Sequence, residues 1–294
     1  MTTTLAPPPE PASPPPPLSP GGRTAVRAVL MIAAAILVIG LVVTLSTLAW
    51  GVSTFRVVTD SAALPATLRS VAIDTGSVPV AIRITSDREA REPRVDMRMV
   101  NSTRAGSDPL SVSTDELTAR VTIDAEDSPI LDWGRASEIT LVLPPEVARR
   151  MTVTTQQQMG VVLAQADVDQ LIARTDEGAV VLSGSANHID ITNENGDVHT
   201  REPIEVSESF RAVTRNGDVS VDFTAAPETI DADSATGDIV IALPRPGPYS
   251  VDATTGQRWG TTVVRVPQTR DPQNAASVVT VRSDTGDVIV EELR

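Results

Sequence analysis

Four near-identical turns in the second half of the chain constrain its fold more than any other feature. Each joins glycine and aspartate to a branched aliphatic residue: Asn195-Gly196-Asp197-Val198, Asn216-Gly217-Asp218-Val219, Thr236-Gly237-Asp238-Ile239 and Thr285-Gly286-Asp287-Val288. Degenerate copies without the aspartate occur at Gly160, Gly178 and Gly256. From Gly160 to Gly256 the glycines are 18, 18, 21, 20 and 19 residues apart, and a longer step of 30 residues leads to Gly286. A regular period of this length indicates a repeat architecture, in which each repeat buries its apolar face by stacking on its neighbours.

The residues on either side of these turns predict short strands. Apolar and polar residues alternate with a period of two, as in Val219, Val221 and Phe223, which is typical of half-buried strands. Residues 55–132 are less regular and predict an atypical first section, such as a cap. The predicted fold is therefore all-β, a β-solenoid-like domain of short strands whose structural turn residues are Gly196, Gly217, Gly237 and Gly286. Among them, Gly217 and Gly237 are expected to have positive φ.

A long apolar segment near the N-terminus predicts a membrane span. Residues 28–50 are 23 consecutive positions without a charge. A helix of that length is roughly 34 Å long, enough to cross a hydrocarbon core of about 30 Å. Because Arg23 and Arg27 precede the span, the positive-inside bias places the N-terminus in the cytoplasm and the C-terminal domain outside. The span exceeds the usual length of a signal-peptide core, which favours an uncleaved signal anchor over the alternative, a cleaved signal peptide.

The span divides a single-pass cell-membrane protein into four parts. We expect a proline-rich disordered cytoplasmic tail at 1–27, the transmembrane helix at 28–50, a juxtamembrane linker at 51–69 and an extracytoplasmic β-repeat domain at 70–294. The tail has nine prolines between Pro7 and Pro20, and proline lacks the N–H that helices and sheets use. We interpret it as a solvated tail, with a docking site for a proline-reading partner as the alternative.

Charge narrows the range of partners. Glu10, Arg23 and Arg27 are the only charged residues before residue 51, so residues 51–294 hold 37 of the 38 acidic residues and 22 of the 24 basic ones, all arginine. The resulting net charge of −15 repels nucleic acid, which we exclude as a partner. It attracts cations and basic partners, or serves only as a solubilising coat. Cysteine is absent, so no disulfide supports the domain.

Three features of the sequence together resemble a known family. They are the Gly-Asp turns, the single span ahead of them, and the strand-ending pairs Leu143-Pro144 and Leu243-Pro244. It is the bacterial putative-adhesin family, whose members are envelope proteins built from β-strand repeats. The resemblance covers residues 70–293, although the turns at Gly160, Gly178 and Gly256 depart from the pattern. It implies a β-solenoid-like fold and no established activity.

These observations predict a membrane-anchored cell-envelope protein that displays an acidic domain for interaction or structural support. Its expected partner is an envelope protein or polymer. One alternative is an accessory protein of envelope-stress sensing, which passes a signal through the span to the tail. A third is a polysaccharide-acting enzyme with Asp197 and Asp218, or Asp218 and Asp238, as paired carboxylates. Aromatic residues, on which sugars usually stack, are only 2% of the chain, so we do not expect an enzyme. Metal-ligand clusters, Walker-type phosphate loops and a dinucleotide glycine fingerprint are absent from the sequence, so we expect no cofactor.

The repeated aspartates are the candidate site residues: Asp197, Asp218, Asp238 and Asp287. In rungs about 4.8 Å apart they would line one edge of the stack. Calcium, which takes about six to eight oxygen ligands, is a weak alternative for a metal site, because the glycine-rich nonapeptide of calcium β-rolls is missing. The favoured interpretation is that each aspartate accepts hydrogen bonds from turn N–H groups. No catalytic residue is expected, since the only histidines, His188 and His199, accompany no nucleophile elbow.

Overall fold

The chain consists of two units, Met1–Thr54 and Phe55–Arg294. The computed structural model describes residues 31, 33–34, 37–42 and 44, which are helical, and residues 55–102, 109–123 and 137–293. Among these, no helix is both long and apolar enough to cross a membrane. The predicted tail, 1–27, lies outside the described residues, as does much of the predicted span, 28–50, so both stay predictions.

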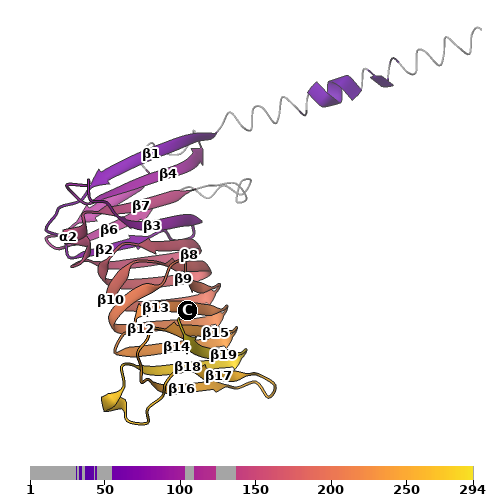
Figure 1. The fold of residues 1–294 in the computed structure, drawn as a ribbon. Coiled ribbons are helices and arrows are strands. Elements are labelled where there is room, and N and C mark those ends of the chain that lie inside the picture. The colour runs from indigo at the N-terminus through magenta and orange to yellow at the C-terminus, as the bar shows by residue number, and fades with distance from the viewer. Residues whose placement is uncertain are drawn as a thin grey trace, which may run out of the picture. The chain divides into compact units, whose positions relative to one another are not determined.

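The second unit is built almost entirely of strands (Figure 1). Its first part comprises β1 (Phe55–Ala63), β2 (Ser70–Asp74), β3 (Val80–Ser86), β4 (Arg94–Ser102), β5 (Leu110–Thr114), β6 (Thr118–Ile123), β7 (Glu138–Leu143) and the short helix α2 (Pro145–Ala148). Its second part comprises β8 (Thr152–Gln165), β9 (Val168–Leu182), β10 (Ser185–Asn195), β11 (Val198–Thr200), β12 (Ile204–Asn216), β13 (Val219–Ala225), β14 (Thr229–Thr236), β15 (Ile239–Leu243), β16 (Ser250–Thr255), β17 (Thr262–Arg265), the 3-10 turn η1 (Pro272–Asn274), β18 (Val278–Thr285) and β19 (Val288–Glu292). The predicted all-β fold is confirmed.

Each repeat is one rung of a parallel stack. A rung consists of a strand, a glycine turn and a second strand, and strands pair in parallel with their equivalents in the next rung. Thus β10 pairs with β12, opposing Ile189 to Phe210, and β11 pairs with β13, opposing Val198 to Val219. In β8 and β9 both halves form one continuous strand that runs through the glycine. This arrangement confirms the predicted β-solenoid-like architecture.

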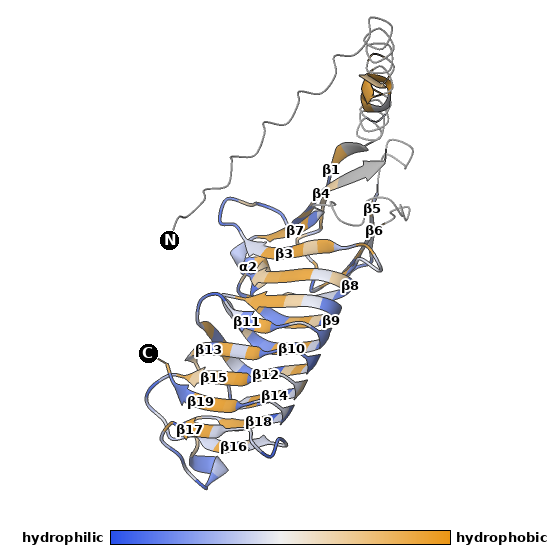
Figure 2. Cartoon of the chain, turned by 90° about the vertical axis from the view of Figure 1, so that its right-hand side faces the viewer, coloured by the Kyte–Doolittle hydropathy of each residue, from blue (hydrophilic) through white to orange (hydrophobic). Residues whose placement is uncertain are grey.

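In-register stacking also builds the core. Val198, Val219, Ile239 and Val288 occupy equivalent positions in successive rungs, and all are fully buried. Figure 2 colours the chain by hydropathy, with apolar strand segments in orange and hydrophilic turns and loops in blue. The core is therefore a set of aliphatic columns, as the alternating pattern predicts.

The last two rungs do not follow chain order. Along the chain, the Gly256 rung comes between those of Gly237 and Gly286. Instead, β18 and β19 pair with β14 and β15, and the earlier strands β16 and β17 lie outside them. The 30-residue step therefore contains the connection that returns the chain into the stack. The N-terminal end of the stack also departs from chain order. There β2 and β3 pair with β8, and the later strands β6 and β7 pair with them on the outer side.

The β unit begins earlier than the predicted boundary at residue 70. The expected linker, 51–69, contains β1, which pairs antiparallel with β4 over nine residues and buries Val58. The repeat pattern could not locate β1, because this strand belongs to no Gly-Asp rung. Antiparallel pairing also joins β4 to β7 and β5 to β6. These strands form the atypical cap that the irregular sequence predicts.

Candidate functional site

The repeated glycines form a column in which the backbones of neighbouring rungs approach closely. A Cβ atom on Gly217 would lie 2.0 Å from the carbonyl oxygen of Gly196, and one on Gly237 would lie 2.0 Å from that of Gly217. The predicted positive φ is present at both, 158° and 152°. The close approach is the stronger constraint, because a φ near 158° lies close to the ordinary extended range.

A second column, of buried polar side chains, hydrogen-bonds to these glycines. Thr214 Oγ1 donates to the carbonyl oxygen of Gly196 at 3.3 Å, and Ser234 Oγ donates to that of Gly217 at 3.0 Å. Asn193 and Ser283 make the equivalent bonds in their rungs, and the terminal rung uses Thr255. The sequence analysis missed this column. Its signal is a serine, threonine, asparagine or glutamine three residues before each of Gly160, Gly178, Gly196, Gly217, Gly237 and Gly286.

The aspartates form a ladder along the turns. Asp197 Oδ1 accepts the backbone N–H of Asp218 at 3.0 Å, Asp218 Oδ1 accepts that of Asp238 at 2.8 Å, and Asp238 Oδ1 accepts that of Asp287 at 2.8 Å. Asp287 Oδ1 ends the ladder on the N–H of Thr261 at 2.7 Å. Turn N–H groups are thus the donors, as the favoured interpretation holds, but each donor belongs to the adjacent rung rather than to the aspartate's own turn.

The ladder also bears on the two alternatives for these aspartates. Within the described ranges, no three acidic or histidine side chains are arranged to hold a metal ion. The calcium alternative stays a prediction that a binding measurement must test. For paired-carboxylate chemistry, one oxygen of each aspartate already accepts a backbone N–H.

Outward side chains also meet across rungs. Arg211 lies between two aspartates of the neighbouring strands, with N–O distances of 3.6 Å to Asp190 and 3.5 Å to Asp231.

His188 contacts Ser209 Oγ through Nδ1 at 3.0 Å and Glu208 Oε2 through Nε2 at 3.1 Å. This group lies where a register shift in β12 brings two residues opposite one. The side chains of His188 and Glu208 are 39% and 57% exposed.

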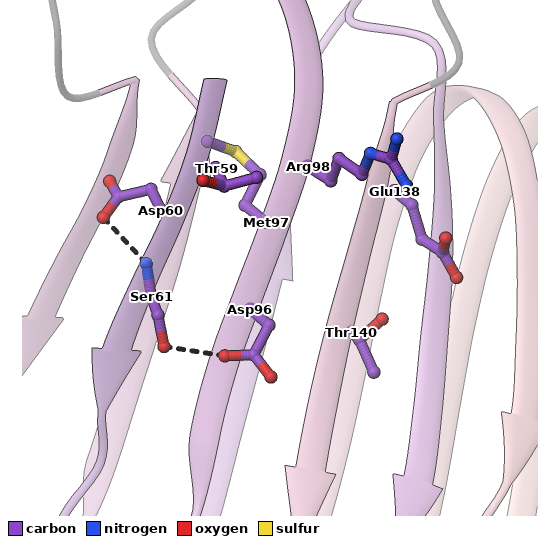
Figure 3. A pocket seen from close by; sticks show the side chains of 8 residues that line it. All are labelled: Thr59, Asp60, Ser61, Asp96, Met97, Arg98, Glu138 and Thr140. Atoms are coloured by element: carbon purple, nitrogen blue, oxygen red, sulfur yellow. Dashed lines mark hydrogen bonds between the residues drawn. The ribbon is translucent and has the colours of Figure 1, made fainter. Parts of the chain in front are cut away.

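A shallow hollow of about 340 Å³ lies over β1, β4 and β7 (Figure 3). Ser61 Oγ donates to Asp96 Oδ1 at 2.6 Å, and Arg94 Nε lies 2.9 Å from Asp96 Oδ2. At its margin, Arg83 Nε lies 2.8 Å from Glu138 Oε1. Asp96 and Glu138 thus have arginine partners. Asp60 and Arg98 also line the hollow, and Asp60 Oδ1 accepts the backbone N–H of Ser61 at 2.8 Å.

Near the C-terminal end of the β unit, residues 267–269 form hydrogen bonds with Tyr249, which directly precedes β16. The buried Tyr249 donates its hydroxyl hydrogen to the carbonyl oxygen of Pro244. Its backbone N–H donates to Pro267 at 2.8 Å, and its carbonyl oxygen accepts from Thr269 at 2.8 Å. Burial raises the pKa of the Tyr249 hydroxyl, and the negative charge of Glu292 raises that pKa further. The hydroxyl therefore remains a protonated structural donor.

Comparison with known structures finds several bacterial proteins of similar arrangement. A putative cell adhesion protein from Clostridium sporogenes has 9% identity and a TM-score of 0.40, over 81% of this chain and 100% of that one. A putative adhesin from Bacteroides fragilis has 12% identity and a TM-score of 0.39, over 81% and 97%. A protein from Parabacteroides distasonis, described as a putative lipid binding protein, has 10% identity and a TM-score of 0.43, over 80% and 96%.

Comparison of sequences gives a family for the repeat region. No curated protein matches the chain. The family model described as Toastrack DUF4097 matches residues 146–291, which run from α2 to β19. This match supports the resemblance for the rungs that carry the glycine column and the aspartate ladder. The repeat region of this chain is thus similar to the Toastrack DUF4097 family.

Proposed function

We propose that the chain is a membrane-anchored cell-envelope protein whose acidic β-repeat unit provides an extended surface for interaction or structural support, in the manner of an adhesin. The carrying observation is the in-register stack. It repeats outward side chains at one position in rung after rung, as at Asp190, Arg211 and Asp231 on β10, β12 and β14. A rigid array of this kind suits contact with a large partner better than it suits chemistry on an enclosed small molecule.

The outward charges themselves support a role in interaction. The side chains of Arg211, Asp190 and Asp231 are 52%, 41% and 51% exposed. Ion pairs this exposed contribute at most about 1 kcal/mol to stability. Stability alone therefore gives little reason for the repeated outward charges, and a binding partner would give one.

Photo-crosslinking in the host bacterium tests this function. A photoreactive residue is placed at Thr192 on β10 or at Ser220 on β13, which are exposed positions in the two halves of the rungs, and samples kept in the dark are the control. We expect adducts with an envelope protein or polymer from at least one exposed position and none in the dark. A folded, exported protein without adducts would contradict the proposal. Adducts only under envelope stress, with a signalling protein, would favour the sensing alternative.

A protease experiment tests the anchoring. Protease added to spheroplasts should digest the repeat unit and spare an epitope at residues 1–20, because the arginines before the predicted span favour a cytoplasmic N-terminus. Loss of both together would contradict this topology.

A further inference from the structure

The β16–β17 rung is an open end of the stack. Among the described strands, β16 pairs only with β18 and β17 only with β19, so neither has a strand on its outer side. Val251, Ala253 and Val264 pack against the core from this rung but stay partly exposed. Terminal repeats normally need a polar cap to remain soluble without a partner, and unpaired strand edges are templates for another chain.

The outer edge of β17 presents free backbone groups. Thr261 directs both of its groups toward the neighbouring rung: its N–H donates to Asp287 Oδ1 at 2.7 Å, and its carbonyl oxygen accepts from Val288 at 2.9 Å. Successive residues of a strand direct their backbone groups to opposite sides. Thr262 and Val264 therefore direct their N–H and C=O groups to the open edge.

The loop that enters β17 exposes an aromatic side chain. Here the Gly-Asp turn is replaced by Gly256, Gln257, Arg258, Trp259 and Gly260. Trp259 is 87% exposed, more than any other large hydrophobic residue in the described ranges. The loop is nonetheless ordered by a turn, because the N–H of Gly260 donates to the carbonyl oxygen of Gln257 at 3.1 Å. An exposed tryptophan on such a turn is a typical interaction anchor.

The charge of this segment is opposite to that of the protein. Residues 256–270 contain Arg258, Arg265 and Arg270 and no acidic residue, in a chain of net charge −14. Arg258 and Arg270 form no ion pair with any described residue, and Arg265, 65% exposed, lies 3.8 Å from Glu291. The edge of β16, by contrast, carries Asp252, and its start is closed by residues 267–269.

We propose that the β17 edge binds an extended acidic peptide segment of a partner protein by strand addition. The peptide pairs with the outward backbone groups of Thr262 and Val264, places an apolar side chain against Trp259, and sets carboxylates beside Arg258 and Arg265. This inference rests on the proposed interaction function and assigns it a surface and a partner chemistry.

Fluorescence anisotropy on the full-length protein tests the proposal. The probe is a labelled ten-residue peptide of alternating glutamate and valine, and the comparison peptide has lysine in place of glutamate. We expect the acidic peptide to bind and to weaken with added salt. Trp259→Ala and Arg258→Glu should each weaken binding on the order of tenfold. Thr262→Pro should do the same without unfolding the protein, because proline is tolerated where the N–H faces an open edge.

Two matched variants control for side-chain size and charge. Leu117→Ala removes another exposed apolar residue, and Arg174→Glu reverses an exposed charge on β9, so both should bind like the wild type. Equal binding of the lysine peptide, no binding of the acidic peptide to folded wild type, or equal losses in the controls would overturn the proposal. So would self-association abolished by Trp259→Ala without peptide binding, which would assign the edge to a second copy of this chain. The crosslinking positions Thr192 and Ser220 are independent of this edge, so the two proposals can fail separately.

Discussion

Two kinds of rung share one backbone stack but differ in their polar networks. The regular rungs turn at Gly196, Gly217, Gly237 and Gly286, and the degenerate rungs turn at Gly160 and Gly178. In the regular rungs aspartates accept N–H groups across rungs, and hydroxyl groups donate to glycine oxygens. In the degenerate rungs Val161 and Ala179 replace the aspartates, and the buried side-chain polar atoms of Gln157 and Thr175 have no hydrogen-bond partner among described residues. Glycine stacking therefore suffices for the architecture, and the polar network is an addition to it.

This difference predicts an uneven distribution of stability. A buried polar group without a partner costs about 1–3 kcal/mol, whereas a made hydrogen bond contributes about 1 kcal/mol. Both effects favour the rungs of β12 to β15, whereas the Gly196 rung still holds Asn193 Oδ1 without a partner among the described residues. Regions with weaker local networks open at lower free energy, so β8 and β9 should exchange amide hydrogens sooner than β12 to β15.

The largest expected effect concerns the glycine column, which both regions share. Gly217→Ala and Gly178→Ala would place a Cβ atom 2.0 Å and 1.6 Å from a backbone oxygen, so a rung must shift in either case. We expect each to lower the free energy of unfolding by about 3 kcal/mol or more, as for severe overpacking. Gly76→Ala is the control, because it has a φ of 54° but no atom within 4 Å of the added Cβ. It should cost only about 1–2 kcal/mol in urea unfolding, and equal losses would refute the stacking explanation.

The next effect separates the two regions directly. Thr214→Val and Thr175→Val are the same isosteric change at two residues that are each 2% exposed. Thr214→Val removes the donor to the carbonyl oxygen of Gly196, so we expect a loss of about 1–2 kcal/mol. Thr175→Val removes a hydroxyl without a partner and should be neutral or stabilising. Urea unfolding of both variants checks this, and equal destabilisation would mean that the networks do not differ.

A smaller effect is expected from the aspartate ladder, which is exposed to water. Asp218→Ala removes the acceptor of the Asp238 N–H and should cost about 1 kcal/mol. Asp218→Asn should cost less, since the amide oxygen still accepts. Ala179→Asp would extend the ladder into a degenerate rung by offering an acceptor to the N–H of Asp197, with an expected gain of up to about 1 kcal/mol. A destabilising Ala179→Asp would show that the degenerate turns cannot take the ladder geometry.

The sequence predicts the parts of this fold that repeat, because stacking forces equivalent residues into equivalent positions. The glycines, the aliphatic alternation and the all-β class follow from it. The position of β16–β17 outside β18–β19 does not, because spacing along the chain specifies that rungs exist and not the order in which they pair. The residues around Trp259 could not be assigned either. Their significance depends on lying at an open end, which only the strand order reveals.

We expect the smallest effect from calcium, which should not change the stability of the aspartate ladder. Each carboxylate from Asp197 to Asp287 already accepts a backbone N–H, so a cation would have to compete with this hydrogen bond for its oxygens. We expect millimolar calcium, or a chelator, to leave the melting temperature of the β unit unchanged. A ladder built for calcium would instead be stabilised by about 2.7 kcal/mol at a hundred times the dissociation constant. Asp218→Asn would abolish that stabilisation and Ala179→Asp would increase it. A rise of several degrees with this pattern in the two variants would make the regular rungs a cation site and turn the proposed surface into a calcium-dependent one.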